Sequence, residues 1–315
     1  KAAGVPMDSI YIKEARKNKI PVEMDVSLFA KLAPEAVIVG VTGTRGKSMT
    51  TALAYQILKQ NEKFLKRKVY IGGNVRGVAT LPLLKKIKTG DIVVCELDSW
   101  QLQGFGDAKM SPYISVFTSF MSDHMNYYNN DVKKYFADKA NIFKYQKKGD
   151  ILIVRPHVVK LIPKNIKSKL IVADANAVKS YKFIVPGEHQ RENLACAVAL
   201  SKQFQVPEVR IREAVKNFKG LEGRLQYLKT HKGIKIYNDN NATTPEATIA
   251  GIRALQEGKS IGEIILISGG ADKNLNLALY VNVVNTFCKA AVLIPGTGTN
   301  ILLKEHKLRI PNETG

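Results

Sequence analysis

The chain has 315 residues, of which 45% are apolar, so it has enough material for two domains with buried cores and is not a disordered protein. No apolar run approaches the ~20 residues that cross a bilayer. The three cysteines lie far apart among apolar neighbours, which is typical of free thiols in a reducing cytoplasm.

The formal net charge of +21 leaves two interpretations open. A basic face for nucleic acid is one of them. The lysines are spread along the chain without interleaved aromatic residues, however. We therefore favour a lysine-rich background, or attraction to small polyanions such as nucleotides, and expect no nucleic-acid partner.

The first predicted elements enclose a glycine-rich loop. Residues 36–41 form an apolar run typical of a buried parallel strand, and a helix is predicted from Lys47 to Gln60. The loop between them reads Thr42, Gly43, Thr44, Arg45, Gly46, Lys47, Ser48. Glycines let backbone N–H groups turn toward an anion, the lysine adds charge, and the helix N-terminus favours phosphate. The usual P-loop needs glycine where Val41 stands, so we expect phosphate binding by a different loop of this kind.

Strands and helices alternate through the middle of the chain. Strands are predicted at residues 69–74, 91–97, 113–120, 150–154 and 169–174, and helices at residues 131–146, with an aspartate cap, and 193–204. This order predicts an α/β fold with a central P-loop-type, mostly parallel sheet flanked by helices.

The pattern changes near residue 222. A hairpin is predicted at residues 224–239, with its turn at residues 231–233, and a helix at residues 245–256. Strand-plus-turn units follow at residues 261–270 and 289–297. We therefore predict a second, smaller Rossmann-like α/β domain.

Three further side chains are candidates for chemistry near the loop. Glu96 ends a predicted strand, where an acid can hold Mg²⁺ beside phosphates or can merely close the strand. His124 follows another strand, but a lone histidine is more often structural, and Mg²⁺ prefers oxygen. For Lys139, on a helix with apolar and aromatic neighbours, the pattern alone favours a surface lysine.

These features occur together, in this order, in one protein family. The loop matches the pattern TGTxGK[ST], and further matches are GGNVRG at residues 72–77, ELDSWQL at residues 96–102 and DHMNYY at residues 123–128. On these motifs the chain resembles the Mur ligases, ATP-dependent amino-acid ligases of peptidoglycan precursor synthesis. The likeness runs from residue 4 to about residue 299. The signatures DNPR and DYNANP, found in relatives that add diaminopimelate or a dipeptide, are absent, which favours addition of D-glutamate.

The resemblance implies roles for individual residues. For ATP it implies the loop at residues 42–48 with Lys47 on the phosphates, Asn193 at the adenine, and Arg224 and Asp239 from the second domain. For two Mg²⁺ ions it implies Ser48 with Glu96 and His124 with a carbamylated Lys139, so that Lys47, His124 and Lys139 form the catalytic set. For the substrates it implies Asn74 near the muramoyl group, and Thr243 and Lys273 near D-glutamate.

The chain departs from the family pattern at three of these motifs. Asp98 stands where the family has serine, Asn126 where it has aspartate, and Asn241 where it usually has lysine. The last change removes one expected charge contact in the second domain.

The implied reaction runs through an acyl phosphate. The carboxylate of UDP-N-acetylmuramoyl-L-alanine attacks the γ-phosphate of ATP, and the amine of D-glutamate then displaces phosphate. We expect a cytoplasmic monomer that acts on small molecules. The alternatives are a Mur or folylpolyglutamate-type ligase with another acceptor, and an ATP-binding homologue without catalysis.

The resemblance also implies a division into domains. Residues 1–35 are expected to be the tail of an N-terminal UDP-binding domain. Residues 36–222 are expected to be the ATP-binding domain, and residues 223–315 an incomplete amino-acid-binding domain.

Overall fold

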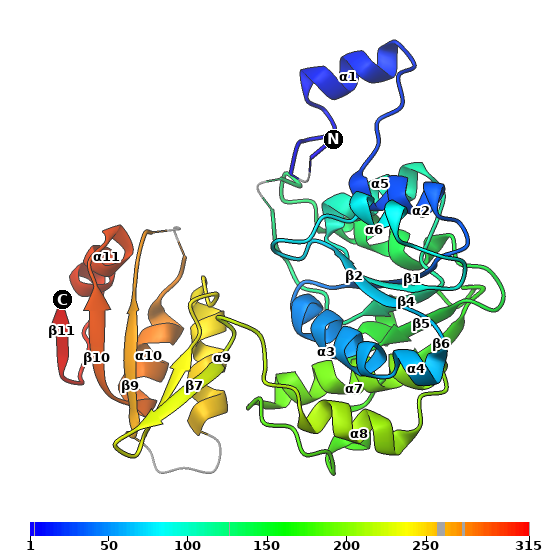
Figure 1. Cartoon of the computed structure of the whole chain (residues 1–315). Helices are drawn as coiled ribbons and strands as arrows, with labels where there is room; N and C mark the ends of the chain where they lie inside the picture. Colours follow the sequence, from blue (N-terminus) through cyan, green and yellow to red (C-terminus); the bar gives the residue numbers. More distant parts are fainter. Residues whose placement is uncertain (3, 126, 257–261, 273–274, 315) are drawn as a thin grey trace. The chain divides into compact units, whose positions relative to one another are not determined.

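The computed structural model describes residues 1–2, 4–125, 127–256, 262–272 and 275–314. The chain divides into two compact units (Figure 1). The first contains residues 1–182 and 191–218, and the second contains residues 183–190 and the chain from residue 219 onward. Residues 183–190 thus group with the second unit although they precede the predicted division at residue 222.

The first unit is built on a six-stranded sheet in which all neighbouring strands are parallel. Its strands are β1 (Val37–Thr42), β2 (Val69–Gly73), β3 (Ile92–Glu96), β4 (Ile114–Phe117), β5 (Ile151–Val154) and β6 (Lys169–Val172). Each lies at or within one of the predicted strand segments, apart from the last residue of β1, and the predicted parallel α/β sheet is confirmed. In the strand order β2-β3-β1-β4-β5-β6, the chain crosses from β1 to the edge strand β2, returns to β3, and then passes β1 to reach β4, β5 and β6 on the other side. The chain therefore reverses its direction of travel around β1, and ligands of open α/β sheets bind at the carboxyl ends of strands at such a point.

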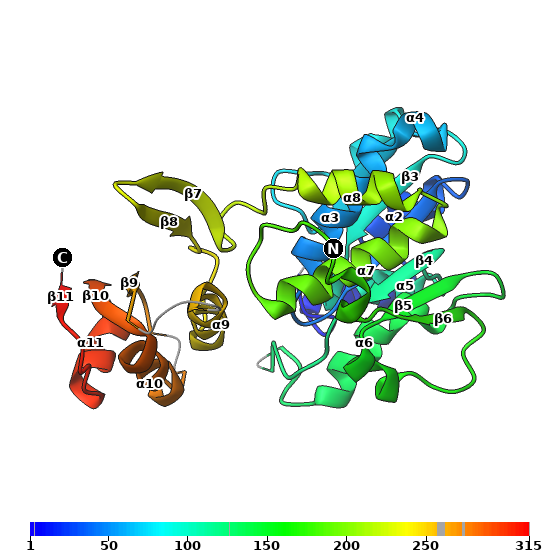
Figure 2. The ribbon, with the colours of Figure 1, turned by 90° about the horizontal axis from the view of Figure 1, so that it is seen from below.

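Helices cover both faces of this sheet (Figures 1 and 2). The helices of this part of the chain are α1 (Ile10–Lys17), which stands away from the sheet, α2 (Asp25–Leu32), α3 (Lys47–Gln60), α4 (Glu62–Leu65), α5 (Ser99–Asp107), α6 (Val132–Lys144), α7 (Glu188–Gln203) and α8 (Glu208–Lys216). Short 3₁₀ helices lie at Leu81–Lys85, Pro156–Leu161 and Ala175–Val178. The predicted aspartate cap of α6 is confirmed, because Asp131 accepts hydrogen bonds from the N–H groups of Lys133 and Lys134.

The core on one face of the sheet joins α2, α5 and α6 to the strands. Phe29, Phe105 and Ile142 come from these helices and pack with Val93 and Leu152 of the sheet. Residues 1–35, predicted to be the tail of a separate domain, group with the first unit, and Phe29 of α2 is fully buried in its core.

The second unit contains a hairpin and a three-stranded parallel sheet of order β11-β10-β9. Its elements are β7 (Gln226–His231), β8 (Ile234–Asn238), α9 (Pro245–Gln256), β9 (Ile264–Gly269), α10 (Ala278–Phe287), β10 (Cys288–Ile294), α11 (Thr297–Glu305) and β11 (Asn312–Thr314). The predicted hairpin and the predicted helix at residues 245–256 are confirmed. Ile249, Tyr280 and Leu293 belong to the core of this unit.

Candidate active site

The glycine-rich loop joins β1 to α3 at the carboxyl edge of the first sheet. Gly43 has φ +145° and Gly46 has φ +89°, which only glycine adopts readily. A Cβ at Gly43 would collide with the Thr118 hydroxyl and lie 2.8 Å from the Ser119 nitrogen. The loop is therefore pressed against the end of β4.

Ser119 holds the first half of this loop. The Thr44 N–H donates to the Ser119 carbonyl over 2.8 Å, and the Arg45 N–H donates to Ser119 Oγ, also over 2.8 Å. These two N–H groups are used within the protein, so a phosphate at this loop would face its α3 end, from Gly46 onward.

Two lysines converge on one carbonyl of the loop. Lys47 Nζ donates to the Gly43 oxygen over 2.9 Å and to the Thr44 oxygen over 3.2 Å. Lys139 Nζ donates to the same Gly43 oxygen over 3.0 Å. The predicted loop lysine and the lysine of α6 thus lie at one point.

Lys139 is only 1% exposed, so the surface position that the sequence pattern favoured is wrong. Its ammonium group lies 4.9 Å from the centre of the Tyr135 ring. Burial, with the nearby charge of Lys47, lowers the pKa of Lys139 to about 7. A substantial part of this amine is therefore uncharged near neutral pH.

Glu96 and Ser48 form a pair beside the loop. Glu96 is the last residue of β3, is 5% exposed, and accepts a 3.1 Å hydrogen bond from Ser48 Oγ. A carboxylate and a hydroxyl are oxygen ligands of the kind that Mg²⁺ prefers, so this pair fits the expected ion.

His124 lies in the segment after β4, in a left-handed conformation with φ +56°. Its ring centre is 4.7 Å from that of Trp100, and its Nε2 atom is 3.8 Å from Asp123 Oδ2. Burial lowers the pKa of His124, and the charges of Lys47 and Lys139 act in the same direction, whereas Asp123 opposes them. A neutral imidazole is the form that binds a metal. Asn126 lies outside the described residues.

Within the described residues, no three histidine, cysteine, aspartate or glutamate side chains form a metal cluster. A cation at this edge would need other ligands as well. Hydroxyl groups, phosphate oxygens and a lysine carbamate are the groups that could supply them.

Asn193, on α7, also lies at the loop. Its Oδ1 atom accepts hydrogen bonds from Thr50 of α3, over 3.3 Å, and from Arg155 Nη2. A Cβ at Gly46 would collide with this amide oxygen. The residue expected at the adenine is therefore packed against the loop.

The sequence did not point to Arg155. It directly follows β5, its side chain is buried, and its Nη1 atom donates to Glu192 over 2.8 Å. A charged residue at the end of an apolar strand is the pattern that indicated Glu96, and Arg155 shows the same pattern after β5.

Asn74 follows β2 at the same edge. Its N–H donates to the Glu96 carbonyl over 2.8 Å, and its side chain is exposed. The first unit thus brings together the loop, Asn74, Glu96, Lys139 and Asn193, which are distant in sequence.

The other predicted residues belong to the second unit. Asp239 accepts a 2.7 Å hydrogen bond from the Leu225 N–H, burial raises the pKa of its carboxyl group, and Arg224 beside it is exposed. Their contact with the nucleotide stays a prediction.

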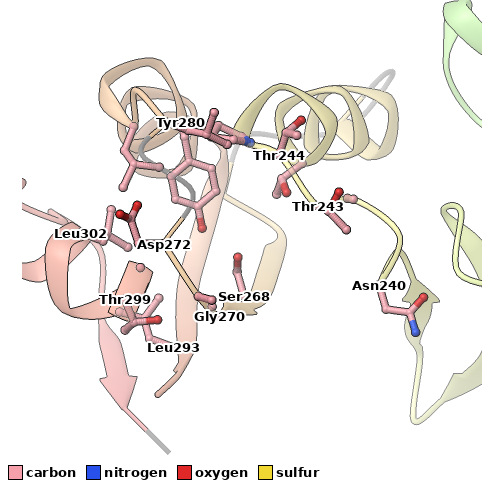
Figure 3. A pocket seen from close by; sticks show the side chains of 18 residues that line it. Asn240, Thr243, Thr244, Ser268, Gly270, Asp272, Tyr280, Leu293, Thr299 and Leu302 are labelled. Carbon is pink, nitrogen blue, oxygen red and sulfur yellow. The ribbon is translucent and has the colours of Figure 1, made fainter. Parts of the chain in front are cut away.

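A pocket of about 330 Å³ opens in the second unit (Figure 3). Thr243 and Thr244 precede α9, Ser268 lies on β9, Tyr280 on α10, and Thr299 on α11, and all five line the pocket. The predicted residue Thr243 therefore borders a space large enough for a small polar molecule, while Lys273 lies outside the described residues.

Comparisons with known proteins agree with this architecture. The Mur ligase middle domain matches residues 41–183. The UDP-N-acetylmuramoylalanine–D-glutamate ligase of Roseiflexus sp. (strain RS-1) is 32% identical over 98% of this chain and 71% of that protein. The enzyme of the same name from Elusimicrobium minutum (strain Pei191) is 30% identical over 93% of this chain and 69% of that protein.

Solved structures show the same fold at lower identity. The MurF ligase of Thermotoga maritima in complex with ADP matches with a TM-score of 0.64 and 17% sequence identity. The match covers 93% of this chain and 80% of the MurF chain. The UDP-N-acetylmuramate–alanine ligase MurC of the same organism matches with a TM-score of 0.67 and 19% sequence identity. This match covers 99% of this chain and 75% of the MurC chain. The chain belongs to the Mur ligase family, whose members are ATP-dependent ligases. No helix in the described ranges is long and apolar enough to cross a membrane.

Proposed function

We propose that the chain joins D-glutamate to UDP-N-acetylmuramoyl-L-alanine, at the expense of ATP, as a step of peptidoglycan precursor synthesis. The observation that carries the proposal is the group of loop, Ser48–Glu96 pair and buried Lys139 at one sheet edge. The choice of D-glutamate as the acceptor is supported by relatives of about 30% sequence identity that are named UDP-N-acetylmuramoylalanine–D-glutamate ligase. We further propose that the enzyme acts in the cytoplasm, where ATP is available, and as a monomer.

The first stage is phosphoryl transfer to the substrate carboxylate. A carboxylate is a poor acylating agent, and the acyl phosphate gives it a good leaving group. Such transfer needs positioning and charge stabilisation more than covalent chemistry. Lys47, once it leaves the Gly43 carbonyl, would hold the phosphates, and Asn193 would orient the base.

Ser48 and Glu96 would hold one Mg²⁺ ion, and His124 with Lys139 a second. These ions would neutralise charge on the phosphate oxygens. The Ser48–Glu96 contact and the packing of His124 against Trp100 suit these roles, and the metal-binding assignment of each residue is a proposal.

Lys139 would take part as a carbamate. Its uncharged Nζ atom attacks CO₂, an N–C bond forms, and one proton leaves, so that a buried neutral amine becomes an anion with two oxygen ligands. The burial of Lys139 and its lowered pKa favour this change, because part of the amine is then uncharged and can act as the nucleophile.

The second stage is attack by the amine of D-glutamate on the acyl phosphate, with release of phosphate. We place D-glutamate in the pocket of the second unit, beside Thr243. Arg224 and Asp239 would reach the nucleotide when the two units close and exclude water, which would otherwise hydrolyse the acyl phosphate.

The test measures phosphate release and amide product from Mg-ATP, UDP-N-acetylmuramoyl-L-alanine and a panel of amino acids. We expect product with D-glutamate, and a fall of at least about 100-fold in turnover for Lys47→Ala, as expected when a transition-state charge contact is lost. Lys63→Ala, which removes an exposed lysine of α4, is the matched control. Product with another amino acid alone would replace the acceptor, and ATP binding without phosphate release would refute catalysis.

Carbamylation has its own test. We expect ¹³C-labelled CO₂ to give one carbamate NMR signal in the wild-type protein that is missing in Lys139→Ala. An identical spectrum for both proteins would refute the carbamate.

A further inference from the structure

The carboxylate of Asp98 has one oxygen in use and one without a partner. Oδ1 accepts a 2.8 Å hydrogen bond from the Gln101 N–H and so caps the start of α5. Oδ2 is buried and has no hydrogen-bond partner among the residues that the structure describes, and Asp98 as a whole is 6% exposed. A buried carboxylate oxygen without a partner is unfavourable, and such an atom calls for a bound group.

Asp98 stands at the active-site edge. It follows Glu96, the last residue of β3, by two positions, and α5 begins immediately after it. Trp100, in the first turn of α5, packs against the His124 ring at 4.7 Å. Asp98 Oδ2 therefore lies in a short segment with Glu96 at one end and Trp100, the residue that contacts His124, at the other.

The electrostatics around Asp98 agree with this position. Burial lowers the pKa of both His124 and Lys139, and the negative charge of Asp98 opposes that effect in both cases. Lys139 nevertheless donates to the Gly43 carbonyl and not to Asp98. No ammonium group in the described part of the chain hydrogen-bonds to Oδ2, which is left for a positive group that binds from outside.

We propose that Asp98 Oδ2 is a ligand of the divalent cation held by His124. This inference rests on the proposed function, because that function requires the second cation. Oxygen from a carboxylate suits Mg²⁺ or Mn²⁺, and the serine that the family pattern has at this position carries no charge. The cation would lie between two anionic groups, Asp98 and the Lys139 carbamate, and would offset their mutual repulsion.

The helix cap makes a clean test possible. Serine and asparagine both cap helices well, so Asp98→Ser and Asp98→Asn keep an acceptor for the Gln101 N–H and remove the charged orphan oxygen. Asp107→Asn makes the same chemical change at the other end of α5, where the side chain is 48% exposed, and serves as the matched control.

Trp100 gives a readout that does not depend on catalysis. It is the only tryptophan of the chain and lies against His124, so a paramagnetic Mn²⁺ ion bound there quenches its fluorescence. We would titrate Mn²⁺ into each protein with a nonhydrolysable ATP analogue, and count bound ions by electron paramagnetic resonance.

We expect the wild-type protein and Asp107→Asn to bind two Mn²⁺ ions per chain. In both Asp98 variants, the affinity for one ion should fall by at least about tenfold, with a parallel loss of Trp100 quenching. Wild-type affinity for both ions in folded Asp98 variants would overturn the proposal. So would unchanged Mn²⁺ binding with a stronger Lys139 carbamate signal, which would make Asp98 the partner of the lysine. Failure of D-glutamate ligation alone would refute the proposed acceptor and leave the metal ligand intact.

Discussion

Gly46 is the residue at which the nucleotide loop can be tested most sharply. It has φ +89°, and an added Cβ would collide with Asn193 Oδ1 and lie 3.0 Å from Arg155 Nη2. Gly46→Ala therefore strains the backbone and also displaces the side chain expected to contact adenine. Gly90 has φ +80°, but no heavy atom of the described residues lies within 4 Å of its added Cβ. Gly90→Ala is the control with the backbone strain alone.

The two variants differ in expected magnitude. A left-handed conformation costs a non-glycine residue roughly 1–2 kcal/mol, which applies to both. Overpacking adds about 1–3 kcal/mol at Gly46 only. The free energy of unfolding should thus fall by about 2–5 kcal/mol in Gly46→Ala and by about 1–2 kcal/mol in Gly90→Ala.

Urea unfolding followed by Trp100 fluorescence measures this difference, because Trp100 lies in the first unit. Calorimetric titration of ATP, under conditions where both variants are folded, gives the second readout. We expect Gly46→Ala to lose ATP affinity and Gly90→Ala to keep it. Equal destabilisation of the two variants, or wild-type ATP affinity in Gly46→Ala, would refute the packing of Asn193 against the loop.

Two further predictions concern charged side chains in the first unit. Arg155→Gln should weaken ATP binding by about tenfold, because Arg155 holds Asn193, which is expected to orient the base. Binding of inorganic triphosphate, which has no base, should stay unchanged. Equal losses for both ligands in calorimetry would show a general effect on the loop and would contradict this account. Burial raises the pKa of Glu62, but hydrogen bonds from Lys59 and the Val69 N–H outweigh it and lower the pKa overall. Glu62→Gln should therefore reduce the free energy of unfolding at pH 7 by on the order of 1 kcal/mol. That difference should shrink as the pH falls through the lowered pKa of Glu62, and a difference that does not depend on pH in urea titrations would contradict this account.

Much of the first unit could be predicted because its central strands β1, β3, β4 and β5 are buried on both faces. Such strands appear in sequence as continuous apolar runs, as in residues 92–95 and 151–154. Glycine and proline positions then located the loop and the hairpin. The motif residues of the site followed from a resemblance, and their common location at the edge of the sheet agrees with it.

The helix α5 escaped prediction for a physical reason. Its sequence SWQLQGFGD contains two glycines, which lower helix propensity. A Cβ at Gly104 would lie 2.8 Å from Met24 Cβ, and one at Gly106 would collide with Asn141. The glycines serve close packing on α2 and α6, and such contacts between distant segments leave no local periodicity.

Lys139 and Arg155 were misjudged or missed for the same reason. Lys139 lies on a helix that also carries exposed lysines such as Lys133, and nothing nearby in sequence distinguishes it. What buries it is the Gly43 carbonyl, 96 residues away along the chain. The environment of Arg155 likewise comes from Glu192 and Asn193, 37 and 38 residues away.

Gly43 connects the phosphate loop to the proposed metal site. Its carbonyl has two lone pairs, and the structure shows a lysine on each: Lys47 at 2.9 Å and Lys139 at 3.0 Å. Lys47 donates two of its three N–H groups to the loop carbonyls of Gly43 and Thr44, so a phosphate would take the third N–H or replace one of these two bonds. Carbamylated Lys139 keeps one N–H on Nζ and can continue to donate to Gly43 while its new carboxylate extends beyond it. In the proposed mechanism the same carbonyl would hold Lys139 in place for the cation while Lys47 turns toward ATP. Gly43 would then act on the proposed metal site as well as on the phosphate loop.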